Sequence, residues 1–418
     1  MESLANCRID GFLRAPPSKS MMVRAVAAAV LAGGETRIEN PSSCEDAEAA
    51  IRVAEAFGAG IERVAGRLSI SMSNGIQSER LDCGESALTM RLFSAVAALV
   101  DRPLTLVGSG SLARRPMDML TGPLAALGVR CAMEGMHAPI RIHGSYKGDR
   151  AEVDARESSQ FLSGLLMALP LRSQDGDAIL RVSGLKSSPY VRMTLELLAF
   201  FGVSLKAAED LSRFEIPGGQ EYRSGLTYAV EGDWSSAAAL LIAGALAGRV
   251  RLSGLRQDSP QADRAVLVAL ERAGAHVEIE AEEVRVEKGA LRPFEFDASA
   301  CPDLLPPLVA LASACPGRSV LSGAHRLRHK ESDRAMALVE EYAKMGGDVR
   351  LEGDALIVFG GPLREAEVES RGDHRIAMSC FLGGVGAGRQ VRVQDADCVA
   401  KSYPGFFNDM KSLGVSWA

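Results

Sequence analysis

The feature that most constrains this chain is a pattern that recurs along its whole length. Each copy contains an amphipathic helix closed by glycine and followed by an alternating strand, as in "AEAFGAGIERV" and "LERAGAHVEI". Glycine accepts the positive φ of a helix C-terminus, so we expect a helix to end at each of these glycines. Subtracting neighbouring positions gives spacings of 70, 74, 72, 72 and 68 residues, and the 418 residues divide into six units. The closing glycines are Gly58, Gly128, Gly202, Gly274, Gly346 and Gly414.

Every unit also contains a second helix made almost wholly of small and apolar residues, such as "SMMVRAVAAAVLAGG" and "SSAAALLIAGALAGRV". Because these helices lack a polar face, we expect them to be central and the amphipathic helices to be peripheral. Alternating helices and strands indicate an α/β fold. A chain of 418 residues is too long for one ordinary core, which favours two domains of three units each.

The same spacing places the domain boundary near Glu231, at the end of the third unit. The N-terminal strand in "ANCRIDGFLRAPP" precedes the first buried helix, and the spacing alone allows it to pair with either half.

The buried helices begin with polar residues, in "SKSMMVR", "GESALTMR", "ESSQFL", "GDWSSAA", "CPDLLPP" and "GDHRIAM". Helix capping explains the serines and acids, but it does not explain the cationic and amide side chains. Helix N-termini that meet Lys and Arg side chains form a site suited to phosphate or carboxylate. The side chains that capping leaves unexplained are Lys19, Arg24, Arg91, Gln160, His374 and Arg375.

Composition excludes several classes of function. The formal net charge is −6 and no basic block is present, so neither nucleic acid nor a membrane surface is an expected partner. The N-terminus lacks the pattern of a signal peptide, and glycines interrupt the apolar helices, so we expect a cytoplasmic protein. Eight cysteines show no C-x-x-C spacing and no grouping with the six histidines, which predicts free thiols and no metal site.

The densest group of charges is "GAHRLRHKESDR", with eight charged or histidine side chains in twelve residues. We expect Lys330, Glu331 and Arg334 to lie at the start of an amphipathic helix, where Lys330 and Arg334 share a face. With Asp303, Glu331 gives two carboxylates among several cations spread over both halves of the chain.

Seven stretches, in order from residue 16 to residue 407, resemble the signatures of the 5-enolpyruvylshikimate-3-phosphate (EPSP) synthase family: "PPSKSMMVR", "SSQFLSGLLMALPL", "SSPYVRMTLELL", "VEGDWSSAA", "RLRHKESDR", "GDHRIAM" and "CVAKSYPGFF". The resemblance implies a two-domain inside-out α/β barrel, with the active site in the cleft between the domains. It assigns residues 17–231 to one domain, and residues 1–16 and 232–418 to the other.

The family transfers the enolpyruvyl group of phosphoenolpyruvate to the 5-hydroxyl of shikimate 3-phosphate and releases phosphate, without a metal or an organic cofactor. Joining two anions at one site requires several cations, which the motifs supply. The resemblance assigns shikimate 3-phosphate to Lys19, Ser20, Arg24, Ser158, Ser159, Gln160, Ser187, Tyr190, Asp303, Arg326 and Lys330. It assigns phosphoenolpyruvate to Lys19, Ala87, Arg115, Gln160, Arg334, Arg375 and Lys401.

The reaction needs one proton delivered to the vinyl carbon and one removed from the hydroxyl. The resemblance implies Asp303 as the base at the hydroxyl, and Glu331 with Lys19 as the proton-handling groups on the other side. Carboxylates beside Lys and Arg are expected to have lowered pKa values, so acid catalysis by Glu331 requires desolvation.

This chain departs from the family pattern at two places. The segment "GESALTMR" stands where the family commonly has "GNAGTAMR" or "GNSGTTMR", which introduces Glu85, Ala87 and Leu88. Arg326 stands where many members have Asn. Glu85 would add a negative charge near two anionic substrates, and Ala87 would add a methyl group where the family binds phosphoenolpyruvate and its competitor glyphosate.

Two alternatives remain open from the sequence. The related UDP-N-acetylglucosamine 1-carboxyvinyltransferase uses a reactive cysteine before an "ARP" motif, and no cysteine lies between Cys83 and Cys131 here. A six-unit repeat could also serve as a non-catalytic scaffold, although a scaffold does not need Asp303 and Glu331 among cations. We expect the protein to be a monomer.

Overall fold

The computed structural model describes residues 8–173 and 176–416, and the chain divides into two compact units. The first unit is Pro17–Val230, and the second combines the described residues of Met1–Pro16 with those of Glu231–Ala418. The chain therefore passes from one unit to the other twice, after Pro16 and after Val230.

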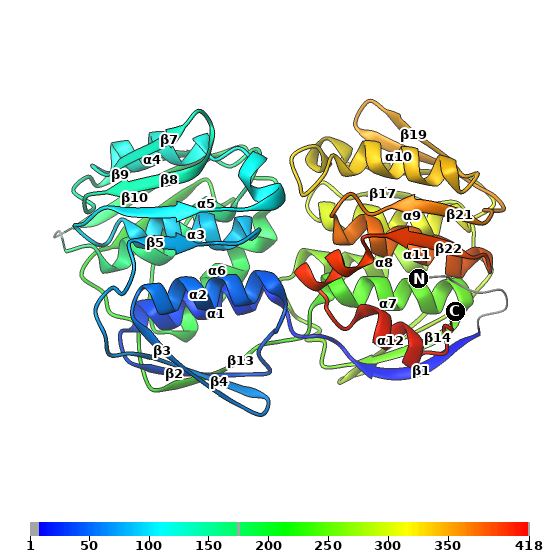
Figure 1. Ribbon diagram of the computed structural model, residues 1–418, viewed down its shortest axis with the longest axis horizontal. Coiled ribbons are helices and arrows are strands. Elements are labelled where there is room, and N and C mark those ends of the chain that lie inside the picture. Colours follow the sequence, from blue (N-terminus) through cyan, green and yellow to red (C-terminus); the bar gives the residue numbers. More distant parts are fainter. Residues whose placement is uncertain (1–7, 174–175, 417–418) are drawn as a thin grey trace. The chain divides into compact units, whose positions relative to one another are not determined.

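In the first unit, three four-stranded sheets surround the helices, in the orders β13-β2-β4-β3, β5-β6-β8-β7 and β11-β12-β10-β9 (Figure 1). Its helices are α1 (Lys19–Ala32), α2 (Glu45–Ala56), α3 (Ala87–Ala97), α4 (Thr121–Ala126), α5 (Gln160–Ala168) and α6 (Ser188–Phe200). Its strands are β2 (Glu35–Glu39), β3 (Ala59–Val64), β4 (Arg67–Met72), β5 (Arg80–Asp82), β6 (Leu104–Val107), β7 (Arg130–Glu134), β8 (His137–His143), β9 (Arg150–Asp154), β10 (Asp177–Ser183), β11 (Lys206–Ala207), β12 (Arg213–Pro217) and β13 (Leu226–Ala229).

The second unit has two four-stranded sheets, β1-β14-β16-β15 and β17-β18-β20-β19, and the two-stranded sheet β21-β22. Its helices are α7 (Trp234–Ala247), α8 (Val266–Arg272), α9 (Leu305–Ser313), α10 (Arg334–Lys344), α11 (His374–Ala387) and α12 (Phe406–Ser412). Its strands are β1 (Ile9–Arg14), β14 (Gly248–Ser253), β15 (His276–Ile279), β16 (Glu283–Glu287), β17 (Glu295–Asp297), β18 (Gly317–Ser322), β19 (Asp348–Glu352), β20 (Ala355–Gly360), β21 (Ala366–Glu369) and β22 (Val391–Gln394).

Helices lie inside each unit and sheets lie outside, which is the inside-out α/β arrangement (Figure 1). The apolar helices are central as expected: α3 contacts α1 and α5 in the first unit, and α7, α9 and α11 contact one another in the second. Every residue of α3 and of α9 is buried. The amphipathic α2 exposes Glu45, Arg52 and Glu55, so its polar face points to solvent.

The six glycines expected to close helices all have positive φ, between 76° and 103°. At Gly58 the backbone also leaves no room for a side chain, because a Cβ atom there would lie 2.4 Å from the carbonyl oxygen of Asn74. The prediction of left-handed helix ends is therefore confirmed at each position.

The last expected strand differs from the prediction. After Gly414, the described residues Val415 and Ser416 are not in a strand, and residues 417–418 lie outside the described part. Elsewhere the strand after the glycine pairs with the next strand of a hairpin, as β3 does with β4, and the described residues after Gly414 include no such partner.

In each unit, one strand beside a crossing point pairs with a strand that is distant in the sequence. The N-terminal strand β1 pairs in parallel with β14, with Ile9 opposite Gly248. In the same way β13, which precedes the second crossing, pairs in parallel with β2. These pairings place β1 in the second unit and fix both crossing points beside the N-termini of central helices.

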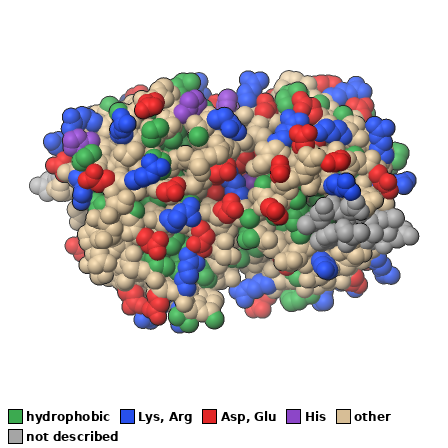
Figure 2. Space-filling model, viewed as in Figure 1, with side chains coloured by type: hydrophobic (Ala, Val, Ile, Leu, Met, Phe, Trp, Pro, Cys, Tyr) green, Lys and Arg blue, Asp and Glu red, His purple; other side chains and the backbone are tan. Residues whose placement is uncertain are grey.

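Lys and Arg side chains alternate with Asp and Glu over the face seen in Figure 2. That face therefore carries no extended field of one sign, in keeping with the small net charge. Among the described residues, no helix has the length and apolar character needed to cross a membrane.

Candidate active site

Lys19 is the first residue of α1, in a helix capped by Ser18, whose hydroxyl accepts a hydrogen bond from the N–H of Met21 (3.4 Å). Its ammonium group lies 3.0 Å from the carboxylate of Asp46 on α2, and both side chains are largely buried. A lysine at a helix N-terminus, held by one carboxylate, provides a cation that can turn toward an anion.

Arg24 is one helical turn further along α1 and only 1% exposed. Its guanidinium donates to the hydroxyl of Thr194 (2.9 Å) and to the carbonyl oxygens of Ser20 (2.9 Å) and Tyr190 (3.2 Å). Burial lowers the pKa of Arg24 to about 10. These contacts fix the start of α6 against α1, so in this structure Arg24 positions Tyr190.

A second buried arginine, Arg91 on α3, joins two segments that carry predicted site residues. One nitrogen donates to the side-chain oxygen of Gln160 (2.8 Å) and to the hydroxyl of Ser158 (3.4 Å), and another donates to the carbonyl oxygen of Pro116 (3.1 Å). Arg91 therefore aligns the start of α5 with the segment that carries Arg115.

Arg115 directly follows the 3₁₀ turn Gly110–Arg114 and is 9% exposed. Its carbonyl oxygen lies 3.2 Å from Nδ1 of His137. Ala87 is the first residue of α3 and is buried, directly after the capping residue Ser86. The first unit thus holds Lys19, Arg115 and Gln160 on the starts of helices or on the loops that precede them.

The other predicted residues of the first unit are also at helix starts. Ser20 is half-buried on α1, and Ser159 and Ser187 are the buried residues that precede α5 and α6. In the second unit, Arg326 is buried and donates to the carbonyl oxygen of Ser299 (3.2 Å). Lys401 ends the 3₁₀ turn Ala396–Lys401 and is buried.

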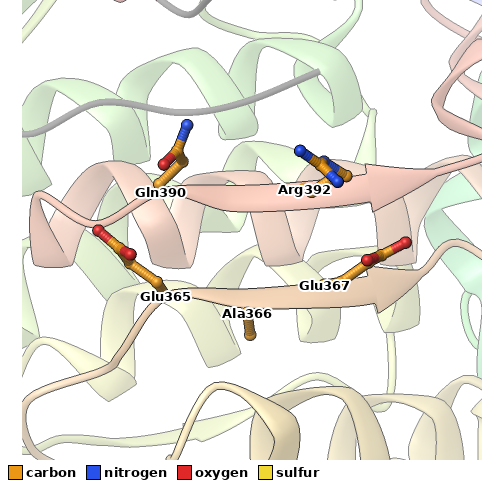
Figure 3. A pocket seen from close by; sticks show the side chains of 5 residues that line it. All are labelled: Glu365, Ala366, Glu367, Gln390 and Arg392. Carbon is orange, nitrogen blue, oxygen red and sulfur yellow. The ribbon is translucent and has the colours of Figure 1, made fainter.

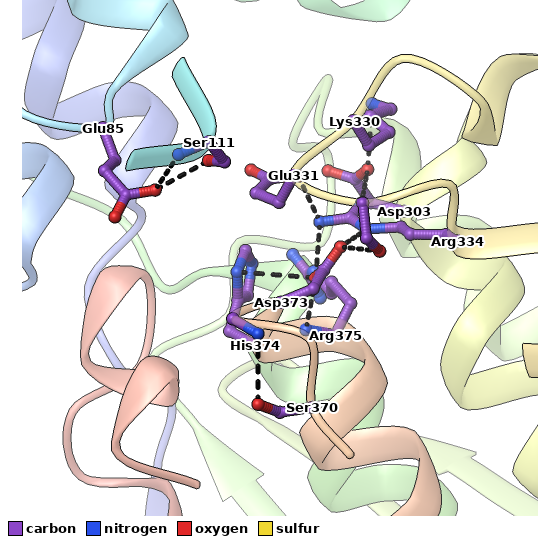
Figure 4. A network of polar contacts seen from close by, with 12 residues as sticks. Glu85, Ser111, Asp303, Lys330, Glu331, Arg334, Ser370, Asp373, His374 and Arg375 are labelled. Atoms are coloured by element: carbon purple, nitrogen blue, oxygen red, sulfur yellow. Dashed lines mark hydrogen bonds and ion pairs between the residues drawn. The ribbon is translucent and has the colours of Figure 1, made fainter. Parts of the chain in front are cut away.

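The second unit contains a dense polar network around Arg334 (Figure 4). The guanidinium contacts both carboxylate oxygens of Asp373 (2.8 and 3.1 Å), one oxygen of Glu331 (2.6 Å) and one of Asp303 (3.0 Å). Lys330 lies 3.1 Å from the same oxygen of Asp303. Arg334 is 1% exposed, and these three carboxylates stabilise its charge and raise its pKa despite the burial.

Asp303 experiences opposing effects. Burial alone would raise the pKa of its carboxyl group, but Lys330 and Arg334 outweigh the burial and hold the pKa well below its usual value. Arg375 acts in the same direction. The expectation of a depressed carboxylate pKa is confirmed for Asp303, and in this arrangement Asp303 is a weak base.

The sequence prediction about Lys330 and Glu331 was wrong in one respect. Helix α10 begins at Arg334 and is capped by Asp333, so Lys330 and Glu331 precede the helix and do not lie on it. The reason is local: the carboxylate of Asp333 accepts from the N–H of Met336 (3.3 Å) and starts the helix there. Lys330 and Arg334 nevertheless meet at Asp303.

Helix α11 is capped by Asp373, whose carboxylate accepts from the backbone N–H of Arg375 (2.9 Å) and from the hydroxyl of Ser332 (3.0 Å). Arg375 is 3% exposed and donates to the carbonyl oxygen of Ser235 (3.1 Å), which ties α11 to the start of α7. The cap of one central helix is thus also the ion-pair partner of Arg334.

Sequence reasoning did not assign Asp46, Asp373 or Asp263. Asp373 was visible only as a helix cap in "GDHRIAM", and Asp46 gave no signal beyond an acidic helix start. Asp263 is 2% exposed, in the 3₁₀ turn Ala262–Ala265, and accepts a hydrogen bond from Ser235. Burial and the nearby Asp303 raise the pKa of Asp263 to about 7, and Arg375 opposes that rise.

A hollow of about 290 Å³ lies at strands β21 and β22 (Figure 3). It presents two carboxylates and one guanidinium, so it does not suit a pair of anions. None of the predicted site residues contributes to it. Its lining consists of Glu365, Ala366, Glu367, Gln390 and Arg392.

Taken by itself, each unit gathers cations at the N-termini of its central helices, an arrangement that binds phosphates and carboxylates. The second unit adds two carboxylates, Asp303 and Glu331, that share the guanidinium of Arg334. Carboxylates held by buried cations can accept or deliver protons once a bound anion changes that pairing.

Comparisons with known proteins agree with this chemistry. The family model described as "EPSP synthase (3-phosphoshikimate 1-carboxyvinyltransferase)" matches residues 5–410. The chain is 40% identical over 407 residues to the 3-phosphoshikimate 1-carboxyvinyltransferase of Thermococcus kodakarensis, covering 97% of this chain and 98% of the relative. The enzyme of the same name from Methanoculleus marisnigri is 36% identical over 97% of both chains. The structure of EPSP synthase from Acinetobacter baumannii superimposes with a TM-score of 0.82 at 25% identity, covering 99% of this chain and 98% of that one.

Proposed function

This chain belongs to the EPSP synthase family, and from that premise we propose the residues through which it acts as a 3-phosphoshikimate 1-carboxyvinyltransferase. The reaction moves the enolpyruvyl group of phosphoenolpyruvate to the 5-hydroxyl of shikimate 3-phosphate and releases phosphate. The observation that carries the proposal is the placement of Asp303 and Glu331 on the single buried guanidinium of Arg334.

Substrate binding is the first requirement. Shikimate 3-phosphate and phosphoenolpyruvate together carry two phosphates and two carboxylates, so the site must supply several cations. In the first unit we assign this role to Lys19 and Arg115, and in the second unit to Lys330, Arg334 and Arg375. Their low exposure supports the assignment, because a charge–charge interaction is stronger where water is excluded.

Hydroxyl and amide groups complete the proposed binding of shikimate 3-phosphate. The hydroxyls of Ser158, Ser159 and Ser187 and the amide of Gln160 can donate to a phosphate or to a ring hydroxyl. We keep Arg326 in this set. Arg24 holds the backbone of Tyr190, and it serves the site chiefly by fixing that segment.

Proton transfer is the second requirement. Asp303 is a weak base while both Lys330 and Arg334 hold it, because the two cations stabilise its ionised form. A substrate anion that draws Lys330 away leaves Asp303 with fewer cationic partners, and the pKa of its carboxyl then rises. We therefore propose that substrate binding itself converts Asp303 into the base that takes the proton of the 5-hydroxyl.

Glu331 and Lys19 are the proposed proton-handling groups at the vinyl carbon. Glu331 is 8% exposed at its side chain and makes a short ion pair with Arg334, and Lys19 is held by Asp46. The carboxylate and phosphate of bound phosphoenolpyruvate compete with Glu331 for Arg334 and with Asp46 for Lys19. That competition frees Glu331 to take up a proton and Lys19 to move toward the donor.

The reaction is tested by measuring phosphate release with each substrate omitted in turn. Phosphate should appear only when shikimate 3-phosphate and phosphoenolpyruvate are both present, because the acceptor hydroxyl completes the chemistry. Release from phosphoenolpyruvate alone at an equal rate would contradict the assignment. The comparisons do not favour the alternative that the protein is a UDP-N-acetylglucosamine 1-carboxyvinyltransferase. UDP-N-acetylglucosamine is therefore a suitable negative control in place of shikimate 3-phosphate.

We further propose that the protein acts in the cytoplasm as a monomer. All seven cysteines in the described part of the chain have free thiols, which fits a reducing compartment. Sedimentation equilibrium at micromolar concentration should give the 44.3 kDa mass of one chain. A stable mass of twice that value would contradict the monomer.

A further inference from the structure

The turn before helix α3 carries a carboxylate that is bound to another loop of the same unit. One oxygen of Glu85 accepts hydrogen bonds from the backbone N–H of Ser111 (2.9 Å) and from its hydroxyl (2.7 Å). Figure 4 shows the two side chains pointing toward each other. Glu85 stands where the family pattern has Asn, so this contact is a feature of this chain's own sequence.

Backbone hydrogen bonds join the same two segments. The N–H of Cys83 donates to the carbonyl oxygen of Val107 (2.9 Å), and the N–H of Ser109 donates to that of Gly84 (2.8 Å). With the two bonds to Glu85, four hydrogen bonds connect the turn before α3 to the segment that follows β6.

Gly110 shows that the loop is built around this carboxylate. Its φ is +52°, in the left-handed region, and a Cβ atom there would lie 2.2 Å from a carboxylate oxygen of Glu85. No side chain fits at that position while Glu85 keeps its place. Glycine at 110 and glutamate at 85 therefore match each other sterically.

The segment held by Glu85 leads directly to Arg115. Ser111 is the second residue of the 3₁₀ turn Gly110–Arg114, and the N–H of Arg115 donates to the carbonyl oxygen of Leu112 (3.1 Å). On the far side, Arg91 holds the carbonyl oxygen of Pro116 (3.1 Å). Hydrogen bonds therefore fix the backbone on both sides of Arg115: those of Glu85 hold the preceding turn, and that of Arg91 holds the following residue.

We propose that Glu85 is a positioning residue that holds the Gly110–Arg114 turn so that Arg115 can bind the enolpyruvyl donor. The proposal rests on the donor-binding role of Arg115 given above. The alternative is that Glu85 acts through its negative charge, by repelling the anionic substrates. A carboxylate whose oxygen already accepts two hydrogen bonds is oriented toward Ser111, and its charge is partly offset by those donors.

Steady-state kinetics of Glu85→Gln and Glu85→Ala separate these two effects. The side-chain carbonyl of Gln can accept both hydrogen bonds without the charge, so Glu85→Gln should keep the Michaelis constant for phosphoenolpyruvate within about twofold. Glu85→Ala should raise that constant about tenfold, with kcat and the constant for shikimate 3-phosphate little changed. Asp118→Asn, which removes an exposed carboxylate beyond the same turn, should have no effect.

Repulsion predicts the opposite result, with both Glu85 variants binding phosphoenolpyruvate more tightly than the natural protein. That outcome, or a Glu85→Ala variant identical to the natural protein, would overturn the proposal. Ser111→Ala keeps the backbone bond and loses only the hydroxyl bond, so it should give a smaller rise, and it serves as the informative variant if Glu85→Ala does not fold.

Hydrogen exchange of the ligand-free protein tests the tether without any assay of activity. In Glu85→Ala, amides of residues 109–115 should exchange several-fold faster than in the natural protein, and in Glu85→Gln they should not. Equal exchange rates of these amides in the natural protein, Glu85→Ala and Glu85→Gln would contradict the proposal that Glu85 holds the turn. If the natural protein shows no turnover, the proposed function fails, and the exchange experiment still decides whether Glu85 holds the loop.

Discussion

At the scale of single residues, most of the candidate site residues could be predicted from the sequence, but most of their ion-pair partners could not. Lys19, Arg334 and Asp303 were identifiable because they stand in distinctive motifs. Asp46, the partner of Lys19, and Asp373, a partner of Arg334, were not assigned. Which carboxylate pairs with a cation depends on how two helices pack, and the sequence around the carboxylate does not show it. The depressed pKa of Asp303 follows the general expectation for a carboxylate beside Lys and Arg, although the cations that cause it, Lys330 and Arg334, come from another segment.

The first residue-scale prediction concerns proton transfer. Lys19→Met and Asp303→Asn should each lower kcat by about 10²- to 10⁴-fold, the usual contribution of a positioned acid or base. Circular dichroism should show the fold retained. Cys131→Ser is the matched control, since it changes a half-buried thiol in the first unit and should leave kcat unaltered. Activity lost in the folded cysteine variant would favour a thiol mechanism.

The second prediction concerns Ala87, which is 3% exposed at the start of α3. A methyl group in close-packed surroundings excludes the longer glyphosate more than phosphoenolpyruvate, and overpacking costs about 1–3 kcal/mol. The natural protein should therefore tolerate glyphosate, and Ala87→Gly should lower its inhibition constant by about one to two decades. An unchanged inhibition constant in Ala87→Gly would show that the methyl group is not what excludes glyphosate.

The third prediction uses the raised pKa of Asp263, whose charged neighbours are Asp303, Arg375 and Asp233, with the thiol of Cys301 as a further titratable group nearby. Between about pH 4 and pH 7 the folded state retains a proton that the unfolded state has lost, so the free energy of unfolding falls as the pH rises. From pH 5 to pH 8 this loss is on the order of 2 kcal/mol.

The measurement is urea unfolding of Asp263→Asn at both pH values. The variant should lose less stability than the natural protein between pH 5 and pH 8, because Asn cannot ionise. Asp258→Asn is the control, since the side chain of Asp258 is 87% exposed and only five residues away. Equal pH dependence in the natural protein and Asp263→Asn would mean that the carboxyl group is already ionised at pH 5.

At the scale of helices and strands, prediction worked where a rule is local. Glycine at helix ends and apolar composition in central helices are properties of short segments, and both predictions are confirmed. The start of α10 was misplaced by four residues because several polar residues in "HKESDR" can cap a helix. Among the described residues, Val415 and Ser416 after Gly414 do not form the expected strand, and the reason is non-local, since a strand needs a partner that its own sequence does not specify.

The element-scale prediction concerns Gly58. Its φ is +103°, and a Cβ atom there would clash with the carbonyl oxygen of Asn74, so the position excludes a side chain. Gly58→Ala should reduce the free energy of unfolding by about 1–3 kcal/mol, because it combines strain at positive φ with a steric clash. Gly75→Ala is the control, since a Cβ atom there meets nothing within 4 Å. Urea unfolding measures both, and equal stabilities would contradict the steric account.

At the scale of the whole molecule, chain length and the sequence repeat indicated an α/β architecture in two domains, and the inside-out arrangement came from the family resemblance. Two units are present, and in the second unit β1 precedes both crossing points while its partner β14 follows them. That pairing could not be derived from spacing alone, because the N-terminal strand could have paired with either half. On this scale we propose as the central claim that cations from both units act on the same substrate.

Calorimetric titration with shikimate 3-phosphate tests that claim most directly. Lys19→Met changes the first unit and Lys330→Met changes the second, and each variant should weaken binding by at least tenfold, because each removes one cation from a doubly charged phosphate. Arg350→Met, an exposed surface arginine of the second unit, should bind as the natural protein does. Undiminished binding in either lysine variant would contradict the claim, since the substrate would then be held by one unit alone.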